Sequence, residues 1–305
     1  MSLTVWMLVT LARAATPEAQ RAAVHQAWAQ QAAQDRARRA STLARLQAET
    51  LVGVELLVAE GTRTPVQSRW GHALLRFVDA DADALDDAVL GFVADPGGPT
   101  LSLWSGVVGG YPVIADLGPL HWVMATYVRD QLRPVTRWVL PTDAQARGRL
   151  VETLTRWSAP GATDPGGYTF AGNNCAWALL RYLDAAGVAP LPAARGLGPH
   201  IPTRLPRHVQ AKLRPAPPIP ALGDVVARAA GALGIPFARA RAGDWPDDVS
   251  PLLGWPPDDI LRLLLNVDVP APAAEALRGA LPENTRADLV ALYGVEPLGA
   301  DAYGR

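Results

Sequence analysis

The chain has 305 residues, of which 49% are hydrophobic and 19% charged, and its formal net charge is −1 at pH 7. This composition is that of a globular protein with a buried core, and it excludes a generally basic chain that would attract nucleic acid. After the N-terminus, no segment reaches the ~18 uncharged apolar residues that span a bilayer. We therefore expect no nucleic-acid partner and no transmembrane segment apart from a leader.

Residues 1–15 are typical of an export signal, because an apolar run from Leu3 to Leu11 is followed by small residues. No Lys or Arg precedes this run, and Arg13 interrupts the small residues. An ordinary buried segment, or a start codon placed inside a longer signal, is the alternative. The export interpretation predicts a periplasmic or secreted protein.

Residues 16–50 predict a helical strap on the surface. Glu, Gln, Arg and Ala dominate the segment, and Thr16-Pro17 is a typical helix start. Strands are predicted at 52–59, 72–78 and 88–94. In the second strand, alternate residues face opposite sides, with His72, Leu74 and Arg76 on one face. The acidic run from 79 to 87 lacks the Gly and terminal Glu of a calcium loop and predicts a solvated turn.

Helices and loops alternate along the rest of the chain. From their patterns we expect an irregular segment or hairpin at 102–114, helices at 120–131, 143–157 and 174–186, a strand at 137–140, a loop at 158–172 and a Pro-rich linker at 214–220. Beyond the linker, 221–305 predicts several short helices separated by Pro-containing turns.

Cys175 is the single cysteine, so an internal disulfide is excluded. It follows Asn174, a good N-cap residue, at the start of the predicted 174–186 helix. The positive end of a helix dipole favours the thiolate that a nucleophilic cysteine needs. A small core residue at a helix start is an equally good interpretation of this local pattern.

His72 is the histidine best placed to act as a base for this thiol. It follows Gly71 at the mouth of a predicted strand, where an imidazole can reach a thiol carried by a helix. The alternative is a half-buried histidine with ordinary hydrogen bonds. Other histidines lie on the strap or in Pro-rich stretches, and His121 is kept in reserve. Without a phosphate-binding loop, an HExxH motif or paired cysteines, we expect no cofactor and no metal.

Two short runs carry a resemblance to a known family. The run from Ser68 to Phe77, SRWGHALLRF, resembles the Ser-x-aromatic-Gly-His-x-x-hydrophobic-Arg motif of the Lnb-type N-terminal periplasmic domain, which is associated with bacterial lipoprotein N-acyltransferases. The run from Tyr168 to Cys175, YTFAGNNC, is similar to that family's Tyr-x-aromatic…Asn-Cys motif. Segments 106–111 and 137–140 fall in a similar order, so the resemblance covers residues from about 52 to 190.

The order of histidine before Asn-Cys also resembles circularly permuted papain-like enzymes of the lecithin–retinol acyltransferase type. The resemblance implies an α+β fold in which a small antiparallel sheet packs on helices. It implies Cys175 as nucleophile and His72 as general base, with Gly71 allowing close approach. Asn174 would cap the helix or help to bind the oxyanion, together with backbone amides near the thiol.

A third, orienting polar residue is expected on the strand after the histidine or nearby. The predicted strand 88–94, AVLGFVA, has no polar side chain. Asp95, just beyond it, is a weak candidate, and a loop residue before Pro96 is the preferred alternative. We therefore divide the chain into a signal peptide (1–15), a strap (16–50), a catalytic papain-like domain (51–213) and a linker with a helical tail (214–305).

The resemblance implies acyl transfer through a thioester, with a phospholipid as acyl donor and a lipoprotein amino terminus as acceptor at a membrane surface. Family members of this kind typically carry membrane-spanning segments after the domain, where this chain has a Pro-punctuated tail. A papain-like thiol hydrolase of the cell envelope (a peptidase or amidase) and a non-catalytic envelope binding domain are the alternatives. Trp70, Trp104, Trp122 and Trp177 are candidates to line an acyl groove, or are plain core residues.

Overall fold

The computed structural model describes residues 17–61, 71–99, 105, 109–131, 133–159, 161–162, 165–169, 172–192, 201–209, 213–219, 223–282 and 303. These residues form two compact units. The first unit holds the described residues up to 120, those from 138 to 215, and Tyr303; the second holds 121–137 and those from 216 to 282. The predicted leader at 1–15 lies outside the described residues.

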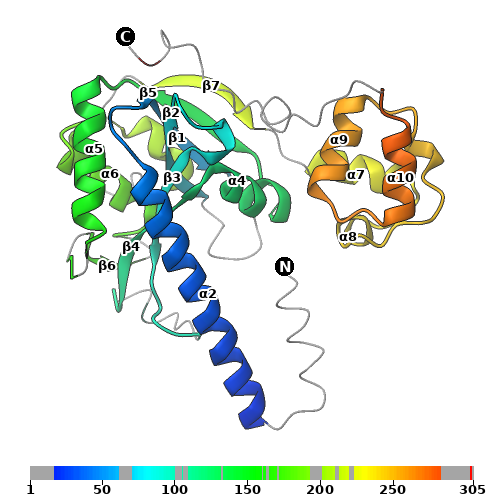
Figure 1. Ribbon diagram of the computed structural model, residues 1–305, viewed down its shortest axis with the longest axis horizontal. Helices are drawn as coiled ribbons and strands as arrows, with labels where there is room; N and C mark the ends of the chain where they lie inside the picture. The colour runs from blue at the N-terminus through cyan, green and yellow to red at the C-terminus, as the bar shows by residue number, and fades with distance from the viewer. Residues whose placement is uncertain are drawn as a thin grey trace. The chain divides into compact units, whose positions relative to one another are not determined.

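A seven-stranded sheet with the strand order β6-β4-β3-β2-β1-β5-β7 organises the fold (Figure 1). Four of its neighbouring pairs, β1–β2, β2–β3, β3–β4 and β4–β6, are antiparallel. The strands are β1 (Leu51–Ala59), β2 (His72–Asp79), β3 (Ala88–Ala94), β4 (Tyr111–Pro119), β5 (Val135–Leu140), β6 (Gly167–Tyr168) and β7 (Arg214–Ile219). The predicted α+β class with an antiparallel sheet is confirmed, and β3 has the predicted bounds.

The two faces of β2 differ as its alternation predicts. Ala73, Leu75 and Phe77 are buried in the main apolar core, together with residues of α6 (Cys175–Ala185). Helix α6 packs on β2 and on β3. Arg76 lies on the other face, fully buried but bonded to carboxylates. The strand therefore serves an apolar core on one side and a polar cluster on the other.

Helices α5 (Ala144–Trp157) and α6 were both predicted from their caps and apolar stripes, and both are confirmed. Asp143 caps α5 by accepting a hydrogen bond from the Ala146 amide at 2.7 Å. After α6, Gly187 has a φ of +64°, a conformation that favours glycine and ends the helix. Tyr182 of α6 donates its hydroxyl to the Leu150 carbonyl at 2.6 Å and so joins the two helices.

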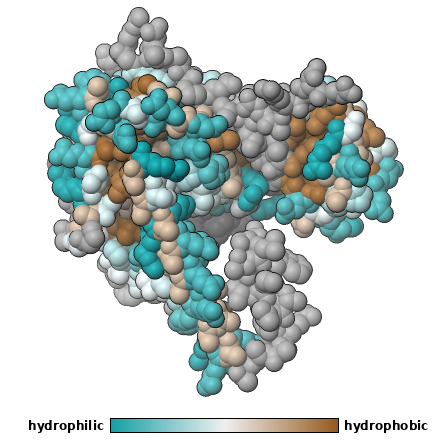
Figure 2. All heavy atoms as spheres, in the orientation of Figure 1, coloured by the Kyte–Doolittle hydropathy of each residue, from teal (hydrophilic) through white to brown (hydrophobic). Residues whose placement is uncertain are grey.

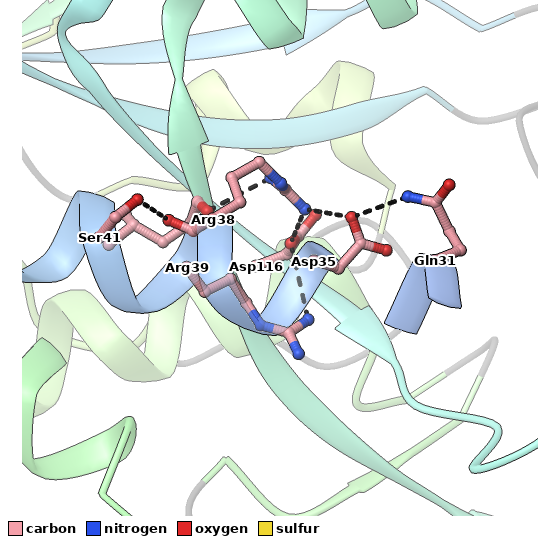
Figure 3. A network of polar contacts seen from close by, with 7 residues as sticks. Gln31, Asp35, Arg38, Arg39, Ser41 and Asp116 are labelled. Carbon is pink, nitrogen blue, oxygen red and sulfur yellow. Dashed lines mark hydrogen bonds and ion pairs between the residues drawn. The ribbon is translucent and has the colours of Figure 1, made fainter. Parts of the chain in front are cut away.

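The predicted strap is the long helix α2 (Pro17–Arg45). Its side chains are mostly exposed, and its visible surface is mostly hydrophilic (Figure 2). Arg38 ties it to β4 by donating to the Asp116 carboxylate at 2.9 Å and to the Leu117 carbonyl at 3.2 Å (Figure 3). The predicted helix at 120–131 is present as α4 (Leu120–Val123), continued by the π-helical segment η3 (Met124–Asp130).

One prediction for irregular structure was wrong. The Pro-rich segment expected to be a linker forms β7, at the end of the sheet next to β5. An edge strand tolerates proline because one row of its N–H groups faces no partner. The Gly-rich segment at 102–114 was expected to be irregular or a hairpin. Its last residues begin β4, which runs on to Pro119, and residues 102–104 and 106–108 lie outside the described residues.

The described part of the tail, 223–282, consists of short helices, as predicted. They are α7 (Gly223–Ala232), α8 (Phe237–Arg241), the 3₁₀ turn η6 (Ser250–Leu252), α9 (Pro257–Asn266) and α10 (Ala271–Gly279). These helices share a separate apolar core, which includes Val226, Leu252, Leu263 and Leu277. Nowhere in the described chain is there a helix of the length and apolarity that a membrane crossing needs.

Candidate functional site

Cys175 is the first residue of α6, and its side chain is buried. Asn174 is the N-cap: its side-chain oxygen accepts hydrogen bonds from the amides of Ala176 at 3.1 Å and Trp177 at 3.2 Å. The thiol therefore lies at the positive end of a capped helix, as the sequence predicts. This position favours the thiolate over the thiol.

The cap also limits how this helix start can bind an oxyanion. Of the first-turn amides, those of Ala176 and Trp177 already donate to the Asn174 oxygen. The sequence left Asn174 with two roles, and the contacts of its oxygen are those of a cap. An oxyanion at this helix start would have to bind donors other than these two amides.

Tyr168, in the short strand β6, is a titratable partner of Cys175 that sequence reasoning missed. Burial raises the pKa of its phenol well above the usual value, and negative charge on Cys175 raises that pKa further. The phenol and the thiol are therefore close enough to interact electrostatically. Tyr168 belongs to the second family motif, but nothing in the sequence alone places its side chain beside the thiol.

A hydrogen-bonded turn joins Tyr168 to the start of α6. The Thr169 amide donates to the Asn173 carbonyl at 3.2 Å, and the Asn173 amide donates to the Thr169 hydroxyl at 2.8 Å. The Asn173 side chain donates to the carbonyls of Pro165 at 2.6 Å and Gly167 at 3.0 Å. The first Asn of the Asn-Asn-Cys run thus holds β6 against the helix start, while the second caps the helix.

His72 is the first residue of β2 and is half-buried. Its Nε2 atom lies over the neighbouring strand β3, 3.1 Å from the point where a Cβ on Gly91 would be. Helix α6, headed by Cys175, packs on β2 and β3, but the His72 ring lies on the face of the sheet opposite the core that α6 shares. The pairing of His72 and Cys175 as base and nucleophile stays a prediction.

Gly71, before His72, has a φ of +90°. A Cβ at this position would lie 2.6 Å from the Ala59 carbonyl oxygen and 3.0 Å from the Thr203 Cγ2 atom. The glycine therefore allows a close approach by the end of β1 and by the 3₁₀ turn η5 (Pro202–Arg207).

Asp95 lies just past the end of β3 and makes the contacts of a turn residue. Its side-chain oxygen Oδ1 accepts a hydrogen bond from the Gly97 amide at 2.9 Å, and its own amide donates to the Pro112 carbonyl at 2.9 Å. These contacts are those of the loop residue that was the preferred alternative for Asp95. The reserve histidine, His121, is exposed on α4.

Arg76, the last polar residue of the first family motif, lies in a buried ionic cluster. It bonds Asp87 through two nitrogens at 2.6 and 2.7 Å, and Glu55 through a third at 3.2 Å. The Glu55 carboxylate also accepts a hydrogen bond from the Tyr303 hydroxyl at 2.9 Å. Gly53 leaves room for the Tyr303 ring, which occupies the place of a Cβ.

Asp87 corrects the prediction that the whole acidic run is a solvated turn. It is 1% exposed and joins the Arg76 cluster. Burial raises its pKa to about 6, although the Arg76 guanidinium acts in the opposite direction. Across the residues that the structure describes, no group of three or more His, Cys, Asp or Glu side chains is arranged to hold a metal ion.

The model of the Lnb N-terminal periplasmic domain matches residues 38–205, more than half of the chain. The chain belongs to this family. The match begins within α2, ends within η5, and contains Cys175, His72 and Tyr168. Comparison with curated proteins and with solved structures gave no match.

Membership of the Lnb N-terminal periplasmic domain family supports a periplasmic location. The two family motifs, residues 68–77 and 168–175, both lie within the matched range. Of the first motif, residues 68–70 are outside the described part of the chain, as are residues 170 and 171 of the second.

Proposed function

We propose that this domain is a cysteine-dependent acyl-transfer enzyme of the cell envelope, with Cys175 as nucleophile and His72 as general base. The observation that carries the proposal is the place of Cys175 as first residue of an Asn-capped helix. The charge interaction of Cys175 with Tyr168 supports the nucleophile. The match to the family model, which contains both Cys175 and His72, supports the pair. The periplasmic family supplies the location.

The proposed reaction has two steps. In the first, His72 accepts the thiol proton, the Cys175 sulfur bonds to the carbonyl carbon of an ester or amide, and the alcohol or amine leaves with the proton from His72. A thioester acyl-enzyme remains. In the second, an acceptor amine gives its proton to His72 and attacks the thioester, which releases an amide and restores the thiol.

The proposed core is permuted papain-like, because the strand histidine precedes the helix-borne cysteine along the chain. The family resemblance favours a phospholipid as acyl donor and a lipoprotein amino terminus as acceptor. Of the tryptophans considered for an acyl groove, Trp177 packs against the main core, and Trp122 is half-buried. Trp70 and Trp104 lie outside the described residues.

The decisive experiment compares the full chain with its Cys175→Ala variant. Each is incubated with phospholipid vesicles and a synthetic diacylated lipopeptide, and the amide product and the intact mass of acid-quenched protein are measured. We expect a fatty-acyl mass on the native chain alone, with product formation abolished in the variant. Full turnover by a folded Cys175→Ala variant would end the proposal.

The two alternatives give different results in the same experiment. A papain-like hydrolase of wall peptides would carry a peptide fragment on the thiol in place of a fatty-acyl group. A binding domain would carry no adduct, and its thiol would react with iodoacetamide at pH 7 like an ordinary cysteine. His72→Ala should abolish turnover, whereas the matched variant His25→Ala, at an exposed site on α2, should retain it.

A further inference from the structure

Tyr303 is buried against the sheet of the first unit, far along the chain from the residues that it contacts. It is 1% exposed, and its hydrogen-bond partner Glu55 lies 248 positions earlier in the sequence. Among the intervening residues, those described from 216 to 282 belong to the second unit. The chain therefore leaves the first unit after Pro215, builds the helical core of α7 to α10, and returns to the first unit at Tyr303.

Gly53 opens a slot on β1 that the Tyr303 ring fills. A Cβ at Gly53 would overlap the ring, so a larger residue at this position would displace it. The register of β1 against β2 shifts between Leu51 and Gly53, as it does at a β-bulge. A glycine within a strand often marks a site where a ligand or another part of the chain approaches closely. Strand β1 is therefore shaped to accept a ring from elsewhere in the chain.

Glu55 forms the polar end of this slot. Its Oε1 atom accepts a hydrogen bond from the Tyr303 hydroxyl at 2.9 Å, and its Oε2 atom accepts one from Arg76 at 3.2 Å. Because Arg76 also pairs with Asp87, two buried carboxylates share one guanidinium. A phenol donates a hydrogen bond to the carboxylate without adding a charge. A phenylalanine ring would fill the same slot but leave the buried Oε1 atom with one donor fewer.

We propose that Gly53, Glu55 and Arg76 form a docking site that recognises a tyrosine side chain, and that Tyr303 occupies it as an intramolecular ligand, which a tyrosine peptide can replace. The ring packs on the glycine, and the hydroxyl bonds the carboxylate. While the site is occupied, the part of the chain that carries α7 to α10 is joined to the first unit on both sides. One link is covalent, at β7, and the other is the docked side chain. An empty site removes the second link.

The docking site lies on the sheet face opposite the α6 core. Val54 and Leu56 of β1 belong to that core, whereas Glu55 between them pairs with Arg76 of β2 on the other face. Cys175 begins α6, so the docking site is separate from the proposed thiol chemistry. Its occupancy is therefore measured through binding and stability, without any need for turnover.

The docking of Tyr303 is an intramolecular event, which bounds the affinity of the site. A side chain tethered through a long connection has an effective concentration of at most about 1 mM. A site that stays occupied under these conditions must bind its tyrosine with a Kd well below that value. A free peptide with the same tyrosine should therefore bind an emptied site in a range that a titration can measure.

The test compares chains that end at Ala302 and at Tyr303. The chain that ends at Tyr303 keeps the occupant and should unfold at the same urea concentration as the full chain, whereas the chain that ends at Ala302 should unfold at a lower one. Fluorescein-labelled peptide 298–305, LGADAYGR, should bind the shorter chain saturably, with a Kd below about 1 mM in fluorescence anisotropy. The same peptide with Tyr303→Phe should bind at least about tenfold more weakly.

Gly53→Ala gives a second measurement that needs no peptide. In the full chain the new methyl group displaces the Tyr303 ring and should lower the urea midpoint. In the chain that ends at Ala302 the slot is already empty, so the same substitution should not lower the midpoint further. An equal loss in both chains would show that Gly53 does not serve the tyrosine, and would overturn the proposal.

The peptide titration has outcomes that refute the docking site. Equal midpoints for the chains that end at Ala302 and Tyr303, no binding of either peptide, or equal binding of both would each do so. Should the shorter chain not fold alone, it is refolded with each peptide: recovery with the tyrosine peptide only supports the site, and any other result refutes it. A full chain that is dimeric only while it keeps Tyr303 would show that the occupant comes from a second copy, against docking within one chain.

Discussion

The two faces of the sheet bury different kinds of side chain. The face against α6 is apolar and holds Leu75 and Phe77 of β2 in the main core. The opposite face holds Arg76 of the same strand, fully buried with two carboxylates, and also carries His72. One family motif therefore supplies both faces, because its residues alternate along a single strand. The apolar face stabilises the fold by burying side chains, and the opposite face holds the buried charges.

Burial contributes to the free energy of unfolding with opposite signs on the two faces. Burying apolar side chains contributes about 25 cal/mol for each Å² removed from water. Burying charges has a desolvation cost that good ion pairs only offset, so a buried salt bridge is weak evidence for stability. The polar face is therefore the one where a single removed partner should matter most, since the remaining charges have no access to water.

The largest effect is expected from Arg76→Met, which keeps the length of the side chain and removes its charge. Glu55 and Asp87 would then be buried without their cation, and breaking a buried pair in this way costs about 3–5 kcal/mol. Urea denaturation followed by circular dichroism measures the loss. The control is Arg239→Met, which removes the arginine of the exposed Arg239–Asp244 pair and should leave the transition unchanged. Equal transitions for the two variants would contradict the contrast between the faces.

A smaller effect is expected from the titration of Asp87. Its folded pKa of about 6 is above its usual value of 3.8. Between these values the folded chain binds a proton that the unfolded chain has lost, so the stability from this group is full below pH 4 and is lost as the pH rises through 6. The change in the free energy of unfolding is up to about 3 kcal/mol, at ~1.4 kcal/mol for each unit.

Urea titrations of the native chain and of Asp87→Asn at pH 4, 5, 6 and 7 isolate this term. The asparagine cannot ionise, so the difference in unfolding free energy between the two chains should change across this range and level off above pH 6. A difference that stays constant from pH 4 to 7 would show that Asp87 titrates alike in the folded and unfolded chains.

Local patterns predicted the elements next to the site. The bounds of β3, the alternation of β2 and the Asn174 cap follow from residues close together in the chain, and all are found. The β7 strand was missed because proline usually marks a linker, and only the neighbouring strand makes it an edge. Patterns of neighbouring residues therefore predict individual helices and strands better than they predict which of these elements pack together.

The contacts of Asp116 and Tyr168 could not be predicted from the sequence, because local patterns do not show which elements pack together. Asp116 meets Arg38 only through the packing of α2 on β4. Tyr168 lies close to Cys175 because of a turn that the Asn173 side chain closes with hydrogen bonds to two carbonyls. Asp87 is an exception that the sequence could have predicted. An arginine in an apolar strand needs a carboxylate, and Asp87 immediately precedes the next strand.

The smallest effect is expected at the cap of α6, on the apolar side of the comparison. Asn174→Ala removes the acceptor of two amides and should cost about 1 kcal/mol of unfolding free energy. Asn174→Asp retains an acceptor oxygen, so its unfolding transition should stay close to that of the native chain. Its negative charge next to Cys175 should nevertheless raise the pKa of the thiol and slow alkylation by iodoacetamide at pH 7. Stability and thiol reactivity thus respond to different variants at one position. If Asn174→Asp reacts as fast as the native chain, the charge at the helix start does not control the thiol, and only the capping role of Asn174 stands.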